Sequence, residues 1–338
     1  MHMADALLSP VVGGTMYAVS AGAVAYSVKK IKMEEIGEKK LPLMAVSGAF
    51  AFAAQMINFT IPGTGSSGHI GGGILLAGLL GGFPAFLTLA AVLIIQCLFF
   101  ADGGLLALGA NIFNMGVIPC LIIYPLLFRP LLKTRRTTGR IGLAAILCAL
   151  VSLQLGAFGV VLETLASGVT ELPFLVFAGV MQPIHLAIGL VEGVITAGIF
   201  SFVHQSRPEL LESTLSRTPF QSGVSMRRTI VILAVLALAV GGGLSLYASG
   251  NPDGLEWSME RVAGTAELER DGTVYEIAAA IQEDTAVLPG YDFDAREGDG
   301  TGVSGIAGAL MTFALAGVLG GAVTFLKRRK RPDRASVQ

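Results

Sequence analysis

The sequence has few charged residues for its length. Only 14% of its 338 residues are Asp, Glu, Lys or Arg, whereas soluble domains carry about 25%. A soluble fold of this size exposes too much surface to be covered by so few charges, so the composition excludes an ordinary soluble protein. Hydrophobic residues make up 53% of the chain, and one membrane span needs roughly 20 of them. We therefore predict an all-α integral membrane protein.

Several chemical motifs are also absent. The three cysteines, Cys97, Cys120 and Cys148, lie in apolar segments without C-x-x-C spacing, which argues against a zinc cage or a disulfide framework. No G-x-x-x-x-G-K-[ST] loop occurs, so we expect no ATP hydrolysis by the chain itself, and no H-E-x-x-H pair is present. Because the first ten residues lack a basic n-region, we expect an N-terminus that is not removed with a signal peptide.

Nine apolar segments are bounded by charges or by Gly and Pro turns. They run over residues 11–28, 42–59, 70–82, 84–100, 106–128, 141–165, 174–203, 229–248 and 304–326. The stretch from 70 to 100 fits either one long tilted helix or a hairpin broken at Gly81-Gly82-Phe83-Pro84. Its first half is short for a span, so we expect it to be tilted or partly re-entrant.

The distribution of basic residues decides between these alternatives. Twenty of the 23 Lys and Arg residues fall into four clusters, at 29–40, 129–140, 207–228 and 327–334. The positive-inside rule puts all four in the cytoplasm, which requires an even number of spans between neighbouring clusters, and only the hairpin gives this parity. We therefore predict about nine spans, an external N-terminus and a cytoplasmic C-terminus. The predicted external loops lie near Gly63, Gly103 and Gly168.

The composition divides the chain into two units. We predict a seven-span core (1–204), a cytoplasmic linker (205–228), a two-span module (229–326) and a basic cytoplasmic tail (327–338). The module contains an external loop, 249–303, that holds 13 of the 24 acidic residues. A solvated surface is the simplest interpretation of such a charged loop.

The first two residues form a chelator if the amino terminus is free and external. The α-amine, the deprotonated amide nitrogen of His2 and the His2 imidazole close a five-membered and then a six-membered ring around one cation. Three nitrogens in one plane suit square-planar Ni(II), Cu(II) or low-spin Co(II), and they disfavour magnesium and calcium, which prefer oxygen. We expect Met1 to be retained, because methionine is normally removed only before small residues. A start at Met3 would delete the chelator.

A fourth nitrogen can come from His69. This residue ends the loop Gly63-Thr64-Gly65-Ser66-Ser67-Gly68-His69, which the predicted topology places on the same external side. A loop histidine that bonds only to the backbone is the alternative. Of the four histidines, only His2 and His69 are predicted to be external. We therefore predict a metal site formed by Met1, His2 and His69.

Further residues are secondary candidates. His185 and Glu192 lie seven positions apart, so both could face one side of a helix, either as an intramembrane ionisable pair or in helix packing. Two rival functions stay open. A self-sufficient secondary transporter or channel would use Glu163, His185 and Glu192, and an intramembrane enzyme would use His185 and Glu192. The candidates in or next to the external loops are Ser67, Asp102 and Asn111.

Four ordered motifs carry a family resemblance. The chain begins MHMADALLSP, similar to M-H-I-x-[DE]-G-[FY]-L-x-P, and the Gly-Ser loop ending at His69 follows. Residues 103–111 form the third motif, and 183–193 resemble a P-[IL]-x-[IL]-A-I-x-E-G run. These motifs resemble the CbiM/NikM family, the substrate-capturing component of nickel and cobalt energy-coupling factor (ECF) transporters. The resemblance covers residues 1 to about 204 and implies that Met1, His2 and His69 supply four nitrogen ligands.

This sequence departs from the family pattern at two positions. Asp102 stands where many relatives carry His, and Ala6 stands where Gly is usual. Neither residue is one of the implied ligands. The departures therefore leave the capture site intact, while loop packing and metal preference stay open.

A second resemblance lies after the core. Asn251-Pro252-Asp253-Gly254-Leu255-Glu256 is similar to the PDGLE signature of a small two-span NikN-like partner, here fused to the core. The two resemblances imply capture of Ni(II) or Co(II) as transported substrate, with nickel favoured, and no permanently bound cofactor. The module has no histidine, so we predict that removing it leaves metal binding intact and abolishes uptake.

The resemblance also implies partners in the cell membrane. A transmembrane coupling protein and cytoplasmic ATP-binding subunits would supply the energy for transport. Gly14, Ala18 and Gly22 recur at intervals of four and form a smooth ridge for close packing, against an internal helix or a partner subunit. The basic clusters are short and juxtamembrane, so we expect contacts with membrane lipid and none with nucleic acid.

Overall fold

The fold was determined as a computed structural model. It describes residues 1–31, 33–216, 218, 226–266, 268, 270–293 and 300–329. Seven of the described helices are long and apolar enough to cross a membrane. They are α1 (Pro10–Lys30), α4 (Gly82–Phe100), a continuous helix over Leu108–Leu131, α7 (Thr138–Ser167), α8 (Phe174–Ser206), the segment Ile230–Tyr247 that includes most of α10 (Met226–Gly242), and α13 (Thr301–Arg329). The predicted helical membrane protein is thereby confirmed.

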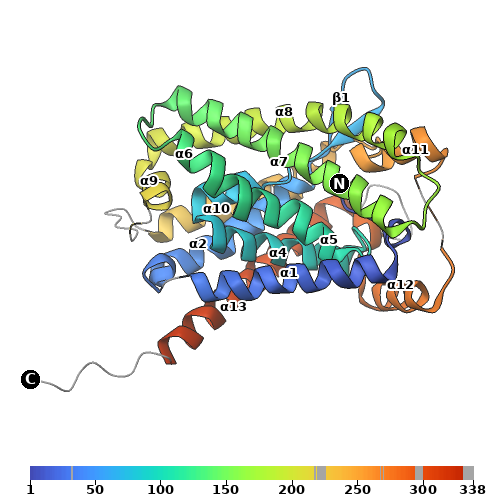
Figure 1. The fold of residues 1–338 in the computed structure, drawn as a ribbon. Coiled ribbons are helices and arrows are strands. Elements are labelled where there is room, and N and C mark those ends of the chain that lie inside the picture. Colours follow the sequence, from blue (N-terminus) through green and yellow to red (C-terminus); the bar gives the residue numbers. More distant parts are fainter. Residues whose placement is uncertain are drawn as a thin grey trace, which may run out of the picture.

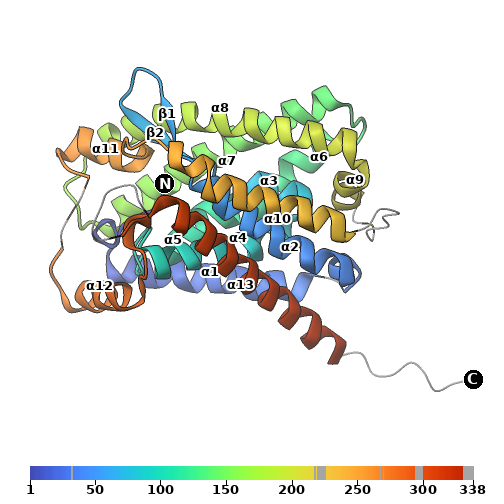
Figure 2. The same ribbon diagram turned by 180° about the vertical axis from the view of Figure 1, so that it is seen from behind.

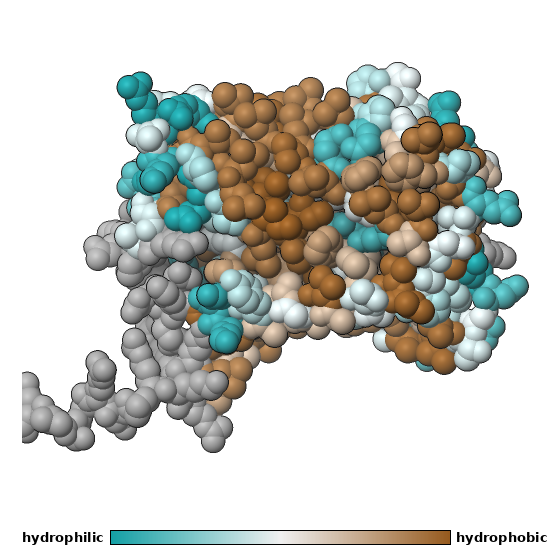
Figure 3. All heavy atoms as spheres, viewed as in Figure 1, coloured by the Kyte–Doolittle hydropathy of each residue, from teal (hydrophilic) through white to brown (hydrophobic). Residues whose placement is uncertain are grey.

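The helices run side by side between two ends of the molecule (Figures 1 and 2). The N-terminus, α11 (Gly254–Ala263) and α12 (Thr273–Thr285) lie at one end, which we call the site end, and α6 (Arg129–Leu131) and α9 (Pro208–Ser216) lie at the other. Polar residues gather at both ends, and a broad apolar surface lies between them (Figure 3). This is the surface expected of a bundle that crosses a lipid bilayer.

Basic residues lie at the end opposite the site end. Arg129 donates to the Leu215 carbonyl oxygen at 3.0 Å, and Arg136 donates to the Ser216 hydroxyl at 3.1 Å. Lys29 and Lys30 end α1. Residues 330–338 of the predicted basic tail and most of the linker after Ser216 lie outside the described residues. The orientation in the membrane and the predicted domain limits stay predictions.

The two remaining predicted spans correspond to α2 (Met33–Gln55) and α3 (Gly73–Leu80). Helix α3 has eight residues and rises about 12 Å, which is less than half of a bilayer core. It ends at Gly81, whose φ of +86° favours glycine, and α4 starts directly afterwards. The predicted hairpin break is therefore present. The count of nine spans stays a prediction, because α3 alone does not cross a membrane.

The chain between α2 and α3 contains a β-hairpin that the sequence did not predict. Strands β1 (Phe59–Ile61) and β2 (Ser66–Gly68) pair antiparallel, with Phe59 opposite Gly68. Each strand has three residues, too few for an alternating pattern to be recognised. The hairpin lies at the site end and leads directly into His69.

Two prolines shape the continuous helix over Leu108–Leu131. It comprises α5 (Leu108–Ile112), η2 (Phe113–Phe128) and α6, and η2 has π-helical hydrogen bonding. Pro119 and Pro125 lie inside η2. A proline ring has no N–H to donate and clashes with the carbonyl four residues earlier, so a locally wider helix accommodates both.

The appended helices pack directly on the core. Helices α10 and α13 contact α2 and each other. A Cβ atom on Gly305 would lie 2.0 Å from the Gly241 carbonyl oxygen, so this approach of α13 to α10 requires glycine. Between them, η3 (Leu244–Tyr247), α11, α12 and η4 (Pro289–Tyr291) cover the site end.

Candidate metal centre

The first residues of the chain are fixed by the backbone of Met3. Its N–H donates to Asn111 Oδ1 at 2.8 Å, and its carbonyl oxygen accepts from Asn111 Nδ2 at 3.2 Å and from Gly104 N at 2.8 Å. The Met3 side chain is fully buried. Ser9 then caps α1 by accepting from Val12 N at 3.4 Å. Asn111, a predicted secondary candidate, therefore positions Met1 and His2 indirectly, through the backbone of the next residue, Met3.

The His2 imidazole is oriented through a relay of amides. The Gly71 carbonyl accepts from Gln55 Nε2 at 2.9 Å, and Gln55 Oε1 accepts from Gln96 Nε2 at 2.9 Å. Because the carbonyl only accepts, Gln96 Oε1 is left to accept from His2 Nε2 at 3.2 Å. The hydrogen on Nε2 leaves Nδ1 for a cation, and Nδ1 is the nitrogen that closes the six-membered ring.

His2 Nδ1 faces a carboxylate in this structure. Asp102 Oδ1 lies 3.1 Å from it, and Tyr291 of the appended module donates its hydroxyl hydrogen to Asp102 Oδ2. Burial lowers the pKa of His2, the Asp102 carboxylate acts in the opposite direction, and the lowered value prevails. Asp102, predicted as a secondary candidate, therefore occupies the position beside Nδ1 that a cation would take.

His69 lies against His2. The two rings are stacked, with centroids 5.3 Å apart and planes 16° apart. His69 Nδ1 lies 3.1 Å from the Ile70 carbonyl oxygen, which fixes the hydrogen on Nδ1 and leaves the lone pair on Nε2. Burial, with the neighbouring Met1 ammonium group and His2, lowers the pKa of His69 to about 4. The imidazole is therefore neutral at neutral pH, as a metal ligand must be.

The loop that carries His69 is held by Glu192. The Gly71 N–H donates to Glu192 Oε2 at 2.9 Å, and the Gly72 N–H donates to Oε1 at 3.0 Å. His185 instead bonds through Nδ1 to the Met181 carbonyl oxygen at 2.8 Å. The possible ionisable pair of His185 and Glu192 is therefore not formed. Ser67 also points away from the histidines, because its hydroxyl donates to the Asn251 carbonyl oxygen at 2.7 Å.

The Met1 amine pairs with a residue that the sequence did not predict. The ammonium group forms an ion pair with Asp253, and the two side chains are 9% and 16% exposed. Burial alone would raise the pKa of Asp253, but the Met1 ammonium group holds it below its ordinary range. Asp253 also caps α11, accepting from Glu256 N at 2.9 Å in a reciprocal capping box.

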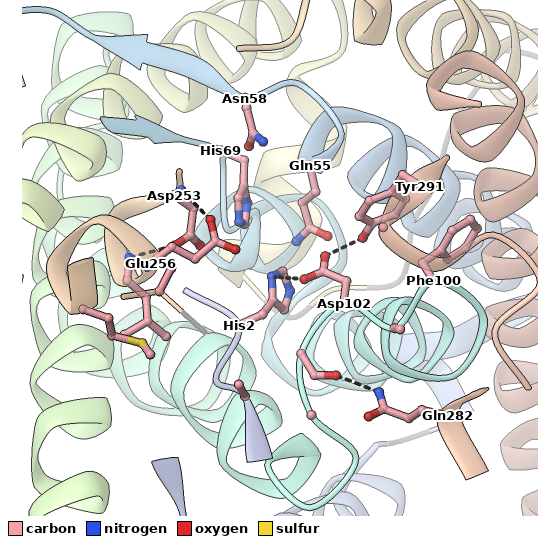
Figure 4. Close-up of a pocket in the computed structure, with 18 of the residues that line it drawn as sticks. His2, Gln55, Asn58, His69, Phe100, Asp102, Asp253, Glu256, Gln282 and Tyr291 are labelled. Carbon is pink, nitrogen blue, oxygen red and sulfur yellow. Dashed lines mark hydrogen bonds and ion pairs between the residues drawn. The ribbon is translucent and has the colours of Figure 1, made fainter. Parts of the chain in front are cut away.

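Four of the residues described above, His2, His69, Asp102 and Asp253, line one cavity of about 1000 Å³ at the site end. His2 and His69 project into it, with Asp102 and Asp253 beside them (Figure 4). Among the described residues, no three His, Cys, Asp or Glu side chains converge on one metal position. A site here therefore depends on main-chain nitrogens of Met1 and His2. Three further site residues were not singled out from the sequence. Tyr291 and Gln282 line the cavity, and Gln282 donates to the Gly103 carbonyl oxygen at 2.9 Å, while Gln96 contacts His2.

The comparisons with known proteins agree with both parts of the chain. Residues 2–210 match the CbiM family, described as the cobalt uptake substrate-specific transmembrane region, and residues 227–325 match the PDGLE domain. A putative fused nickel transport protein NikMN of Archaeoglobus fulgidus is 33% identical over 93% of this chain and 96% of its own. The fused nickel transport protein NikMN of Rhodobacter capsulatus is 32% identical over 77% and 76%.

Shorter relatives cover the core alone. The putative cobalt transport protein CbiM 2 of Methanocorpusculum labreanum is 33% identical over 63% of this chain and 92% of its own. A crystal structure of a transition metal transporter, 32% identical, superposes with a TM-score of 0.53 and covers 64% of this chain and all of its own. These relatives are transport proteins and not enzymes, which confirms the family resemblance predicted from the sequence. The chain is a multi-pass membrane transport protein that belongs to the CbiM family and carries a fused PDGLE domain.

Proposed function

We propose that this protein captures Ni(II) or Co(II) at the site end, outside the cell, through nitrogens of Met1, His2 and His69. The observation that carries the proposal is the stacking of His69 on His2 beside the buried amino terminus. The amine, the His2 amide and His2 Nδ1 provide three donors through two chelate rings, and His69 Nε2 provides the fourth. Four nitrogen donors suit square-planar Ni(II) and low-spin Co(II).

One carboxylate holds a donor while no metal is bound. Asp253 pairs with the Met1 amine, whereas Asp102 faces the lone pair of His2 Nδ1 and does not hold it. Arrival of the cation replaces the ion pair of Asp253, and departure of the cation restores it. Asp253 thus stabilises the empty site and limits the free energy of metal binding, which a transport site needs in order to release its substrate. Movement of the His69 loop would open the site.

We favour nickel over cobalt as the substrate. The relatives that share the fused arrangement are named as nickel transport proteins. The donor set itself accepts both metals, because both bind planar nitrogen ligands. Genes for urease or hydrogenase beside this one would support nickel, and genes for cobalamin biosynthesis would support cobalt.

We propose that energy comes from partner subunits of an ECF-type importer in the cytoplasmic membrane. A coupling protein and ATP-binding subunits would supply this energy, and the lack of a phosphate-binding loop in this sequence fits that division of roles. The small residues Gly14, Ala18 and Gly22 support a contact with such a partner. All three are exposed on α1, and added Cβ atoms on the two glycines would meet nothing within 4 Å.

Binding and uptake measurements test these two proposals separately. The purified protein should bind one Ni(II) per chain with the absorption band of planar nickel, and His2→Ala should abolish the band. His204→Ala is the matched control, because His204 lies in the last turn of α8, away from the site end. Uptake of labelled nickel should require the ATP-binding subunits. Full uptake without them would instead identify a self-sufficient carrier.

A further inference from the structure

His185 has a ring nitrogen without a partner. It lies on α8 and is 1% exposed. Its Nδ1 lies 2.8 Å from the Met181 carbonyl oxygen, which can only accept, so the hydrogen is on Nδ1 and the lone pair is on Nε2. Among the described residues, nothing donates a hydrogen bond to Nε2. Nε2 is therefore available to accept a hydrogen bond from a water molecule or to bind a cation.

The ring of His185 lines a second, smaller cavity. It measures about 20 Å³, enough for one water molecule or one largely dehydrated cation. Met1, His69 and Asp253 of the capture site line the same cavity, together with Met115. The cavity therefore adjoins the capture site and contains the one histidine of α8 that is buried in the bundle.

The PDGLE segment leaves the edge of this imidazole uncovered. A Cβ atom on Gly254 would lie 3.0 Å from His185 Cε1 and 3.1 Å from Nε2, and 2.7 Å from Ile188 Cδ1. Any larger residue would press on the ring and close the cavity. Glycine after Asp253 thus keeps both the carboxylate and the imidazole edge at the cavity.

We propose that His185 Nε2 is a metal donor that receives the captured cation from His69 and holds it in the small cavity beside α8. This inference rests on the proposed capture of Ni(II) or Co(II). A ligating histidine typically donates its other ring N–H to a carbonyl, which fixes the tautomer, and Met181 provides this carbonyl for His185. In the described structure the donors do not converge on one metal position, so the transfer includes a movement of the loop between β2 and α3.

Helix α8 anchors both proposed donors. Glu192, two turns after His185 on α8, accepts from the N–H groups of Gly71 and Gly72, which follow His69 by two and three residues. The donor that gives up the cation and the donor that receives it are therefore anchored to the same helix. Release of the two N–H groups from Glu192 would free His69 and leave His185 in place.

Two substitutions of His185 test the proposal in the full-length protein. His185→Asn keeps a donor near the position of Nδ1 for the Met181 carbonyl but removes Nε2. It should retain the planar Ni(II) band and lose uptake by on the order of tenfold or more. His185→Cys places a thiolate in the small cavity, so added Co(II) should produce a thiolate-to-cobalt absorption. Ile184→Cys, buried on the same helix but outside the small cavity, is the control without that absorption.

Each result decides the question. Uptake by His185→Asn at the native rate, or no thiolate absorption in His185→Cys while cobalt is captured normally, would overturn the proposed position in the small cavity. Loss of the planar band in His185→Asn would also overturn it, because the residue would then only support the capture site. Absence of the planar band in the unsubstituted protein would instead refute the proposed capture site, so the two failures are distinguishable.

Discussion

Blocking the Met1 amine with an acetyl group probes the capture site most directly. Acetylation converts the primary amine into an amide without supplying a new amino terminus, so the chelate loses its amine donor. In the structure the amine is nearly buried and paired with Asp253. Acetylation leaves this carboxylate without its partner, and breaking a buried pair on one side costs about 3 kcal/mol of folding free energy. The acetylated protein should therefore be less stable even without metal.

Added nickel distinguishes the loss of a ligand from a general loss of stability. At a nickel concentration of about 100 times Kd, the native protein gains about 2.7 kcal/mol of stability. The acetylated protein should gain almost none, and its planar band should be missing. Thermal unfolding with and without Ni(II) measures both effects, and the same protein with a free amine is the control. An acetylated protein that binds nickel as tightly as the native one, with the same spectrum, would refute the proposed site.

Three further predictions follow from the same geometry. Asp102→Asn should change nickel affinity while keeping the planar band, because Asp102 faces His2 without supplying a nitrogen; loss of the band in titrations would contradict this. Nickel affinity should fall by at least about tenfold for each unit of decrease in pH between about 8 and about 6, because the His2 amide nitrogen loses a proton when it binds nickel. His69, with its pKa lowered to about 4, should release no proton on binding. A cysteine at Gly65 should react with an impermeant reagent from outside and one at Lys133 should not; equal labelling would refute the topology.

The parts of the fold that could be predicted are those encoded locally. Long apolar runs gave the seven long helices to within a few residues, and the glycine pair after Leu80 gave the break between α3 and α4. The chelating start of the chain is also local, because its donors are adjacent atoms of Met1 and His2. The π-helical run and the three-residue strands leave no distinct period in the sequence.

The partners of the donors could not be predicted, because they come from distant parts of the chain. Asp253 lies 252 residues after Met1, and their ion pair depends on how the fused module folds over the core. The acidic loop was expected to be a solvated surface, yet one of its carboxylates is buried at the site. The PDGLE signature marked this segment as notable, but its sequence alone does not say which atoms it contacts.

The contacts between module and core can be separated from the donors by truncation. The PDGLE segment and the residue after it hold the hairpin before His69. The Pro252 carbonyl accepts from Ser67 N at 2.8 Å, and the Trp257 side chain donates through Nε1 to the Thr64 carbonyl oxygen at 3.0 Å. In the proposed capture cycle, these contacts restrain the loop that moves when metal enters or leaves, and none of them supplies one of the proposed nitrogen donors.

A protein that ends after the core should therefore still bind nickel but exchange it faster. Relatives that align only with the core show that this part exists without the module. Without the restraint on the His69 loop, dissociation should accelerate by about tenfold or more, the factor that corresponds to loss of roughly 1.4 kcal/mol of restraint. A chelator chase after loading with Ni(II) measures this rate, and equilibrium dialysis measures the retained binding. Loss of equilibrium binding in the truncated protein, despite an intact fold by circular dichroism, would show that the module supplies a ligand and that the four-nitrogen site is wrong.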